Sequence, residues 1–173
     1  MEADELIELH EKAHRPVERR IGVTMAVFAA ALATATLMGH RLHTDEVVQQ
    51  TKTADGWAYY QAKNIRAQMY GADATLAELQ GGRGAAVASQ WKVKAGQEQH
   101  DAEKIRSDTE SLERATEGTA RRATLFDASE VFLEIAIVLC SVALLTGSML
   151  FWGISFVGAA IGAAAAIVAL LNT

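Results

Sequence analysis

The chain has 173 residues, half of them hydrophobic, and a formal net charge of -5 at pH 7. This acidic balance, without a clustered basic patch, argues against a nucleic-acid-binding protein, which must neutralise phosphates. One cysteine, Cys140, excludes an intramolecular disulfide. The charges are segregated, because two long apolar segments carry none, and this pattern predicts an all-α integral membrane protein.

The first apolar segment runs without a charge from Ile21 to Gly39, close to the ~20 residues that a helix needs to cross a bilayer. We expect a transmembrane helix over residues 21–42, preceded by a short polar N-terminal segment at 1–20. A cleavable signal peptide is the alternative. The apolar run is longer than is typical of one, and His40-Arg41-Leu42-His43 follows it instead of a small-residue cleavage site.

The second apolar segment, from Ile135 to Thr173, is also uncharged. As a single helix it would be about 58 Å long, nearly twice the ~30 Å of the hydrocarbon core. It must therefore fold back at Thr146-Gly147-Ser148, where Gly147 can adopt the positive φ of a helix C-cap. We expect transmembrane helices over 128–146 and 149–171, arranged as an antiparallel hairpin.

Residues 43–127 are polar and mix 11 Lys and Arg with 13 Asp and Glu. The glycines within 81–84 interrupt this stretch, which predicts a long, coiled-coil-like helical hairpin with its tip at 80–85. The alternating spacing of four and three residues marks a seam on the second arm: Trp91, Ala95, Glu98, Ala102, Ile105, Thr109, Leu112, Thr116, Thr119, Ala123 and Phe126. The first arm offers Val47, Thr51, Ala54, Ala58, Gln61, Ile65, Gln68 and Ala72. Both seams are poor in Leu, which favours further partners such as other copies.

Three aromatic residues, Trp57, Tyr59 and Tyr60, lie within four positions of the first arm. They cannot all face one partner helix, because successive side chains on a helix point about 100° apart. Packing against the second arm or a sister subunit is the plainer interpretation. A ligand or partner-protein surface is the more specific one.

A polar cluster is expected at the membrane interface where the first predicted membrane helix ends and the second begins. Asp127, Glu130 and Glu134 share one helix face, and Glu134 lies one to two turns inside the membrane, where a lone carboxylate costs about 2–3 kcal/mol. We expect Glu134 to pair with Arg41 or His40. The alternatives are a proton- or ion-handling site and a zinc site formed by His40, His43, Glu130 and Glu134, although their spacing is not a metal motif.

Stripes of small residues mark two of the predicted membrane helices. Gly158 and Gly162 form a GxxxG pattern, and Gly22 begins a four-residue repeat with Ala26, Ala30 and Thr34. Such stripes let helices approach closely, within one subunit or between subunits. Two separate stripes in a three-helix protein favour contacts beyond the subunit.

Two runs of residues carry a resemblance to a known family. One extends from Asp55 to Arg66, and the other from Phe126 to Ala136, followed by Leu145-Thr146 and Phe151-Trp152. In these runs the chain resembles a bacterial family known as domain of unknown function 4337. The resemblance covers most of the chain from Ile21 onward and implies a small inner-membrane protein with the same layout. It implies no activity.

No phosphate-binding loop, nucleophile elbow, CxxC or HExxH motif occurs in the sequence. We therefore expect no enzyme, cofactor or metal site. The sequence favours a non-enzymatic membrane scaffold or accessory subunit that contacts lipid, self-assembles or joins a larger membrane complex, and binds no nucleic acid. An oligomeric channel or transport accessory with an acidic pore mouth is the alternative.

The basic residues Lys12, Arg15, Arg19 and Arg20 before the first membrane helix favour a cytoplasmic N-terminus. Residues 43–127 would then be periplasmic in a bacterial inner membrane.

Overall fold

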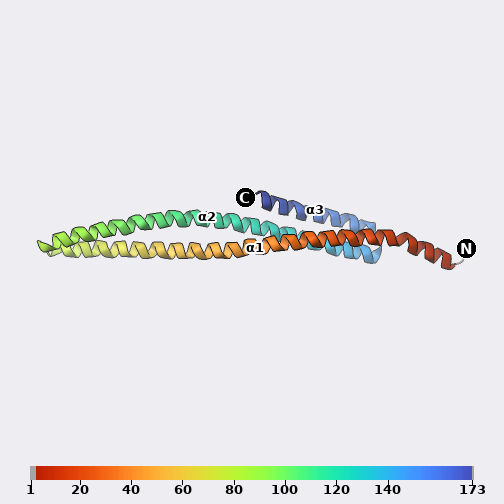
Figure 1. The fold of residues 1–173 in the computed structure, drawn as a ribbon, viewed down its shortest axis with the longest axis horizontal. Coiled ribbons are helices and arrows are strands. Elements are labelled where there is room, and N and C mark those ends of the chain that lie inside the picture. Colours follow the sequence, from red (N-terminus) through yellow and green to blue (C-terminus); the bar gives the residue numbers. More distant parts are fainter. Residues whose placement is uncertain (1–2, 173) are drawn as a thin grey trace. The chain divides into compact units, whose positions relative to one another are not determined.

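The computed structural model describes the backbone of residues 3–172 and the side chains of residues 17–82 and 84–172. Within them lie three helices, α1 (Ala3–Leu79), α2 (Arg83–Thr146) and α3 (Met149–Leu171) (Figure 1). The all-α prediction is confirmed, and each helix contains a stretch long and apolar enough to cross a membrane. The chain divides into two compact units, one formed by Met1–Thr44 with Thr119–Thr173 and the other by Asp45–Gly118.

The polar stretch is not a separate element inserted between shorter membrane helices. α1 continues from its apolar residues into its polar ones, and α2 continues from polar residues into apolar ones. No proline or glycine cluster lies at either transition, so nothing in the sequence interrupts the helix there.

Glycines occupy both breaks between the helices. Gly81 and Gly82 have φ angles of 65° and 35°, and Gly147 has a φ of 66°, in the left-handed region that residues with a β-carbon rarely adopt. Gly84 has a different role, because a β-carbon there would collide with the carbonyl oxygen of Ala77. The sharp reversal after α1 therefore depends on two glycines for backbone angle and one for close approach.

In the unit Asp45–Gly118, α1 and α2 form an antiparallel pair. The seam predicted on α2 is confirmed, because every one of its residues from Trp91 to Phe126 is buried or half-buried. Its fully buried members in this unit are small: Ala102, Thr109 and Thr116. The two helices can therefore run close together along their length.

The seam predicted on the first arm does not face α2. All eight of its residues are exposed, including Val47 and Ile65, which are 61% and 57% exposed. α1 turns a different face to α2 and buries Ala67, Ala74 and Ala77 there. The buried residues of this face are alanines, whose small side chains permit close approach, whereas the predicted seam includes the larger Val47 and Ile65.

Charged groups also lie along this contact. The Lys63 ammonium is 2.9 Å from a carboxylate oxygen of Glu98 and donates a hydrogen bond of 2.9 Å to Asp101. These contacts raise the pKa of Lys63, and the contact with Glu98 has a larger effect than the one with Asp101. The hydrogen bond from Lys63 lowers the pKa of the Asp101 carboxyl. The two helices are thus joined by ionic contacts as well as by small apolar side chains.

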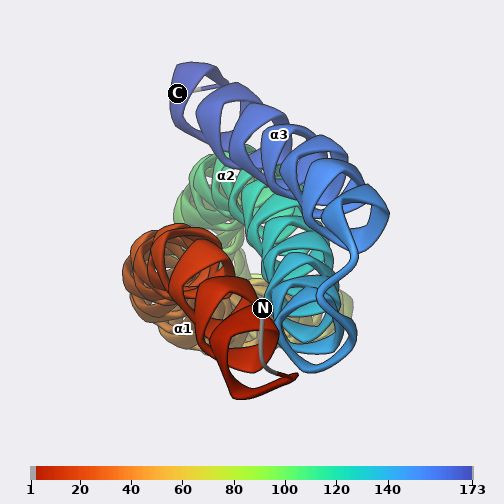
Figure 2. The same cartoon turned by 90° about the vertical axis from the view of Figure 1, so that its right-hand side faces the viewer.

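The other unit has a core built from all three helices. α1 contributes Ile21 and Phe28, α2 contributes Leu133 and Ala136, and α3 contributes Ala159. Figures 1 and 2 show α3 lying along the C-terminal part of α2.

The GxxxG stripe of α3 is used inside the chain. A β-carbon at Gly162 would lie 3.0 Å from the Ser129 carbonyl oxygen, and one at Gly158 would lie 3.4 Å from that of Phe132. This stripe therefore brings α3 against α2, which corrects the expectation that it makes contacts beyond the subunit. Gly22 differs, because a β-carbon there meets nothing within 4 Å. Its companions Ala26, Ala30 and Thr34 are exposed.

Candidate functional site: a polar cluster between α1 and α2

The register of α1 against α2 determines which polar side chains can meet. The Ser141 hydroxyl contacts the Met25 sulfur at 3.5 Å, and Thr36 contacts Glu130. A β-carbon at Gly39 would lie 3.5 Å from that of Phe126. The helices are therefore antiparallel, and each step along α2 toward its C-terminus moves the facing position on α1 toward its N-terminus.

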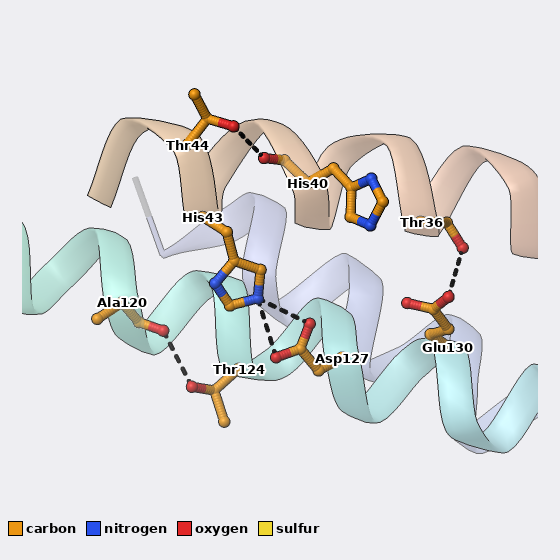
Figure 3. A network of polar contacts seen from close by, with 8 residues as sticks. All are labelled: Thr36, His40, His43, Thr44, Ala120, Thr124, Asp127 and Glu130. Carbon is orange, nitrogen blue, oxygen red and sulfur yellow. Dashed lines mark hydrogen bonds and ion pairs between the residues drawn. The ribbon is translucent and has the colours of Figure 1, made fainter. Parts of the chain in front are cut away.

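Two of these contacts join polar side chains across the helix pair (Figure 3). The Thr36 hydroxyl donates a hydrogen bond of 2.8 Å to the Glu130 carboxylate, and both residues are half-buried. One turn closer to the N-terminus of α2, the two carboxylate oxygens of Asp127 lie 3.0 and 3.1 Å from the His43 Nε2 atom. Polar contacts at defined positions hold this register, because sliding the helices would leave each group without its partner.

Glu134 does not join this cluster. The register places it level with Leu32, about two turns from His40 and Arg41, so the expected Glu134–Arg41 or Glu134–His40 pair does not form. Moving from Asp127 to Glu134 on α2 leads away from these basic residues because the helices are antiparallel. Glu134 is exposed beside Val131, Ile135 and Val138, which are also exposed.

The basic residues after the first apolar run have separate positions. His40 and Arg41 are both exposed, and the His40 carbonyl accepts a hydrogen bond of 2.8 Å from the Thr44 hydroxyl. Among the described residues, no three or more His, Cys, Asp or Glu side chains come together as metal ligands. The cluster can fix a helix register, but its described residues do not form a ligand cage.

The aromatic cluster divides between two faces of α1. Trp57 and Tyr60 are half-buried and pack edge to face, with ring centroids 5.8 Å apart. Tyr59 is 51% exposed and has the Lys63 ammonium 5.9 Å from its ring centroid. Only Tyr59 therefore offers its ring as an exposed surface.

Two further contacts were not singled out in the sequence. Tyr70 and Trp91 stack at 5.1 Å between α1 and α2, with the Lys94 ammonium 4.7 Å from the Trp91 ring centroid. The Arg122 Nε donates a hydrogen bond of 3.1 Å to the Ala169 carbonyl, in the last turn of α3. A cation there complements the helix dipole. Neither contact has a sequence signature, because each joins helices at a distance set by the fold.

Comparison with known proteins gives a family and no activity. No curated protein and no solved structure matches the chain. The family described as domain of unknown function (DUF4337) matches residues 17–172, which include all three apolar stretches and the polar cluster. The protein belongs to this family.

Proposed function

We propose that the protein is a non-enzymatic membrane scaffold that self-assembles or joins a larger membrane complex. In this proposal the apolar stretches of α1, α2 and α3 cross the membrane, and Asp45–Gly118 projects from it as a helical hairpin. The observation that carries the proposal is a regularly spaced row of exposed residues on α1, which includes the apolar side chains of Val47 and Ile65. We call the eight exposed residues of the seam first expected on α1 the outer stripe.

The outer stripe has the repeat spacing of a packing seam, yet α2 occupies the opposite face. Ile65 is 57% exposed, and Met69 and Leu76, about one and three turns further along α1, are 60% and 59% exposed. Single exposed apolar residues are common on proteins, but a row of them at helical spacing is typical of a surface that packs against another helix. In a projecting hairpin this row would otherwise face water.

The first test introduces a charge into this stripe. We expect Ile65→Asp to weaken self-association by about tenfold, because an interface would have to bury an unpaired carboxylate. Native mass spectrometry over a concentration series in detergent measures the copy number. Val93→Asp is the matched control, because Val93 is 61% exposed and lies on α2, outside the outer stripe. A wild-type chain that is monomeric in several detergents, or equal effects of the two variants, would contradict self-assembly through this stripe.

The channel alternative has one observation in its favour, the exposed carboxylate of Glu134 among exposed apolar side chains. A carboxylate at this depth needs water or a polar partner. Ion flux into liposomes that is present for the wild type and abolished by Glu134→Gln, with thermal stability unchanged, would replace the scaffold proposal by the channel.

The proposal includes an orientation, with the N-terminus cytoplasmic and the α1–α2 turn on the opposite side. What supports it is the set of basic residues before Ile21. Ser89, which is exposed near the turn, can report the sidedness as Ser89→Cys in a Cys140→Ser background. We expect a membrane-impermeant maleimide to label it in intact cells. Labelling only after lysis would reverse the orientation.

A further inference from the structure

An open groove of about 550 Å³ lies between α1 and the first turn of α3, within the unit that contains all three helices. Its walls come from five residues: Arg19, Arg20, Val23, Thr24 and Trp152. The first four occupy consecutive turns of α1 at spacings of three and four, so they line one side of that helix. Trp152 closes the other side from α3.

The chemistry of the groove favours an anion. Arg19 and Arg20 are both exposed, and none of the five lining residues is acidic. The Thr24 hydroxyl already donates its hydrogen to the Arg20 carbonyl at 2.9 Å, so the two guanidinium groups are the main donors. Guanidinium groups bind phosphate oxygens through paired hydrogen bonds. The Trp152 indole N–H is buried and has no acceptor among the described residues, so the ring serves as a wall of the groove.

An aromatic row fixes the position of Trp152. Its ring packs edge to face against Phe156, with centroids 5.4 Å apart, and Phe156 packs in the same way on Phe28 of α1 at 5.6 Å. This row connects α3 to α1 directly below the groove. The wall of the groove is therefore held in place by packing between two helices.

The position of the groove along the chain points to the source of the anion. Arg19 and Arg20 immediately precede the apolar run that starts at Ile21, so they lie at the level of lipid headgroups if α1 crosses a membrane. On the membrane side of them, Val23 and Val27 are 59% and 60% exposed and offer an apolar wall. A free phosphate would use only the arginines, whereas a phospholipid uses both surfaces.

We propose that this groove binds an anionic phospholipid, with its phosphate on Arg19 and Arg20 and an acyl chain along Val23 and Val27. Basic grooves between membrane helices are suited to such headgroups because the charge is concentrated where the lipid phosphates lie. The proposal requires the apolar stretch of α1 to lie in a membrane. It does not require self-assembly, so it can fail or succeed independently of the scaffold.

The test measures lipid retained by the purified full chain. The protein is titrated with phosphatidylglycerol or phosphatidylcholine in mixed micelles, and bound lipid is counted by native mass spectrometry. We expect the wild type to retain more phosphatidylglycerol than phosphatidylcholine. The double variant Arg19→Gln/Arg20→Gln should lower the apparent affinity for phosphatidylglycerol by about 25-fold, from about fivefold for each arginine. Thermal unfolding checks that this variant is folded, and the single variant Arg20→Gln provides a milder change.

The control is Arg41→Gln/Arg121→Gln, which removes two exposed arginines outside the groove and should leave the preference intact. Equal loss of bound phosphatidylglycerol in both double variants would overturn the proposed site, because arginines outside the groove would then bind the lipid equally well. Equal retention of the two lipids by the wild type would also overturn it. A competition arm adds glycerol 3-phosphate or inorganic phosphate at millimolar concentration. Full displacement by either would show a soluble-phosphate site and overturn the lipid assignment.

Discussion

Replacing Gly162 by leucine is expected to lower the thermal unfolding temperature of the protein in detergent by about 5–10 °C. The first atom added, the β-carbon, would lie 3.0 Å from the Ser129 carbonyl oxygen and 3.1 Å from Leu133 Cγ. The nearest of these is a backbone atom and cannot turn aside, so α2 and α3 must separate to admit the rest of the side chain. When the two helices separate, the core residues Leu133 and Ala159 lose packing contacts.

Gly153→Leu is the matched control for this prediction. Gly153 lies on the same helix, and a β-carbon there meets nothing within 4 Å. Both variants gain the same intrinsic helix propensity, since each replaces a glycine inside α3. The difference between their unfolding temperatures therefore isolates the α2–α3 contact. If the two variants unfold at the same temperature, α3 does not pack on α2 through Gly162.

This glycine illustrates what the sequence can predict about membrane helices. A stripe of small residues identifies a surface for close helix packing, but it does not name the partner. Gly158 and Gly162 pack against α2 of the same chain, although two stripes in a three-helix protein had favoured contacts between subunits. Gly22 shares the pattern and meets no neighbour within 4 Å. Only the three-dimensional arrangement separates the two cases.

The long polar helices show the same limit in another form. On α2, one face alone had a sustained repeat, and the predicted seam from Trp91 to Phe126 is the face that is buried. On α1, the outer stripe has the same repeat spacing but is exposed and does not face α2. The face of α1 that contacts α2 buries Ala67 and Ala74 and includes Lys63, whose ammonium reaches two carboxylates of α2. A hydrophobic repeat does not reveal a contact that a lysine side chain makes.

The polar cluster was predicted in part. Asp127 and Glu130 do face α1, because i and i+3 positions share a helix face. Their partners are His43 and Thr36, each set by the antiparallel register. Glu134 was assigned to Arg41 or His40 from a common membrane side alone. Their levels along the helix pair differ by about two turns, and that difference depends on the register, which the sequence does not contain.

Gly56→Leu is expected to open the α1–α2 pair in the unit Asp45–Gly118. A β-carbon at Gly56 would collide with the Thr109 hydroxyl and lie 3.0 Å from the Thr109 methyl carbon. Thr109 is 4% exposed, and its hydroxyl donates a hydrogen bond of 2.7 Å to the Ile105 carbonyl. Rotating the Thr109 side chain would break that bond and still leave one of its two branches against the new side chain.

Hydrogen exchange measured by mass spectrometry locates this effect. Amides around Gly56 and Thr109 should exchange about 5- to 150-fold faster, because overpacking of about 1–3 kcal/mol raises the population of the open pair by that factor. Gly71→Leu is the control on the same helix, since a β-carbon at Gly71 meets nothing within 4 Å. The helix-propensity gain is equal for the two variants, so Gly71→Leu should exchange no faster than the wild type.

A second pair of variants identifies Thr109 as the obstacle. Gly56→Ala should show a smaller increase in exchange, and adding Thr109→Ala should remove most of it, because this removes the two nearest atoms, the Thr109 hydroxyl and methyl, and leaves the Thr109 β-carbon at 3.3 Å. Unchanged exchange in Gly56→Leu would mean that α1 does not approach α2 closely at Gly56. The face assigned to α2 would then be in doubt, and so would the exposure of the outer stripe, which lies on the opposite side of the same helix.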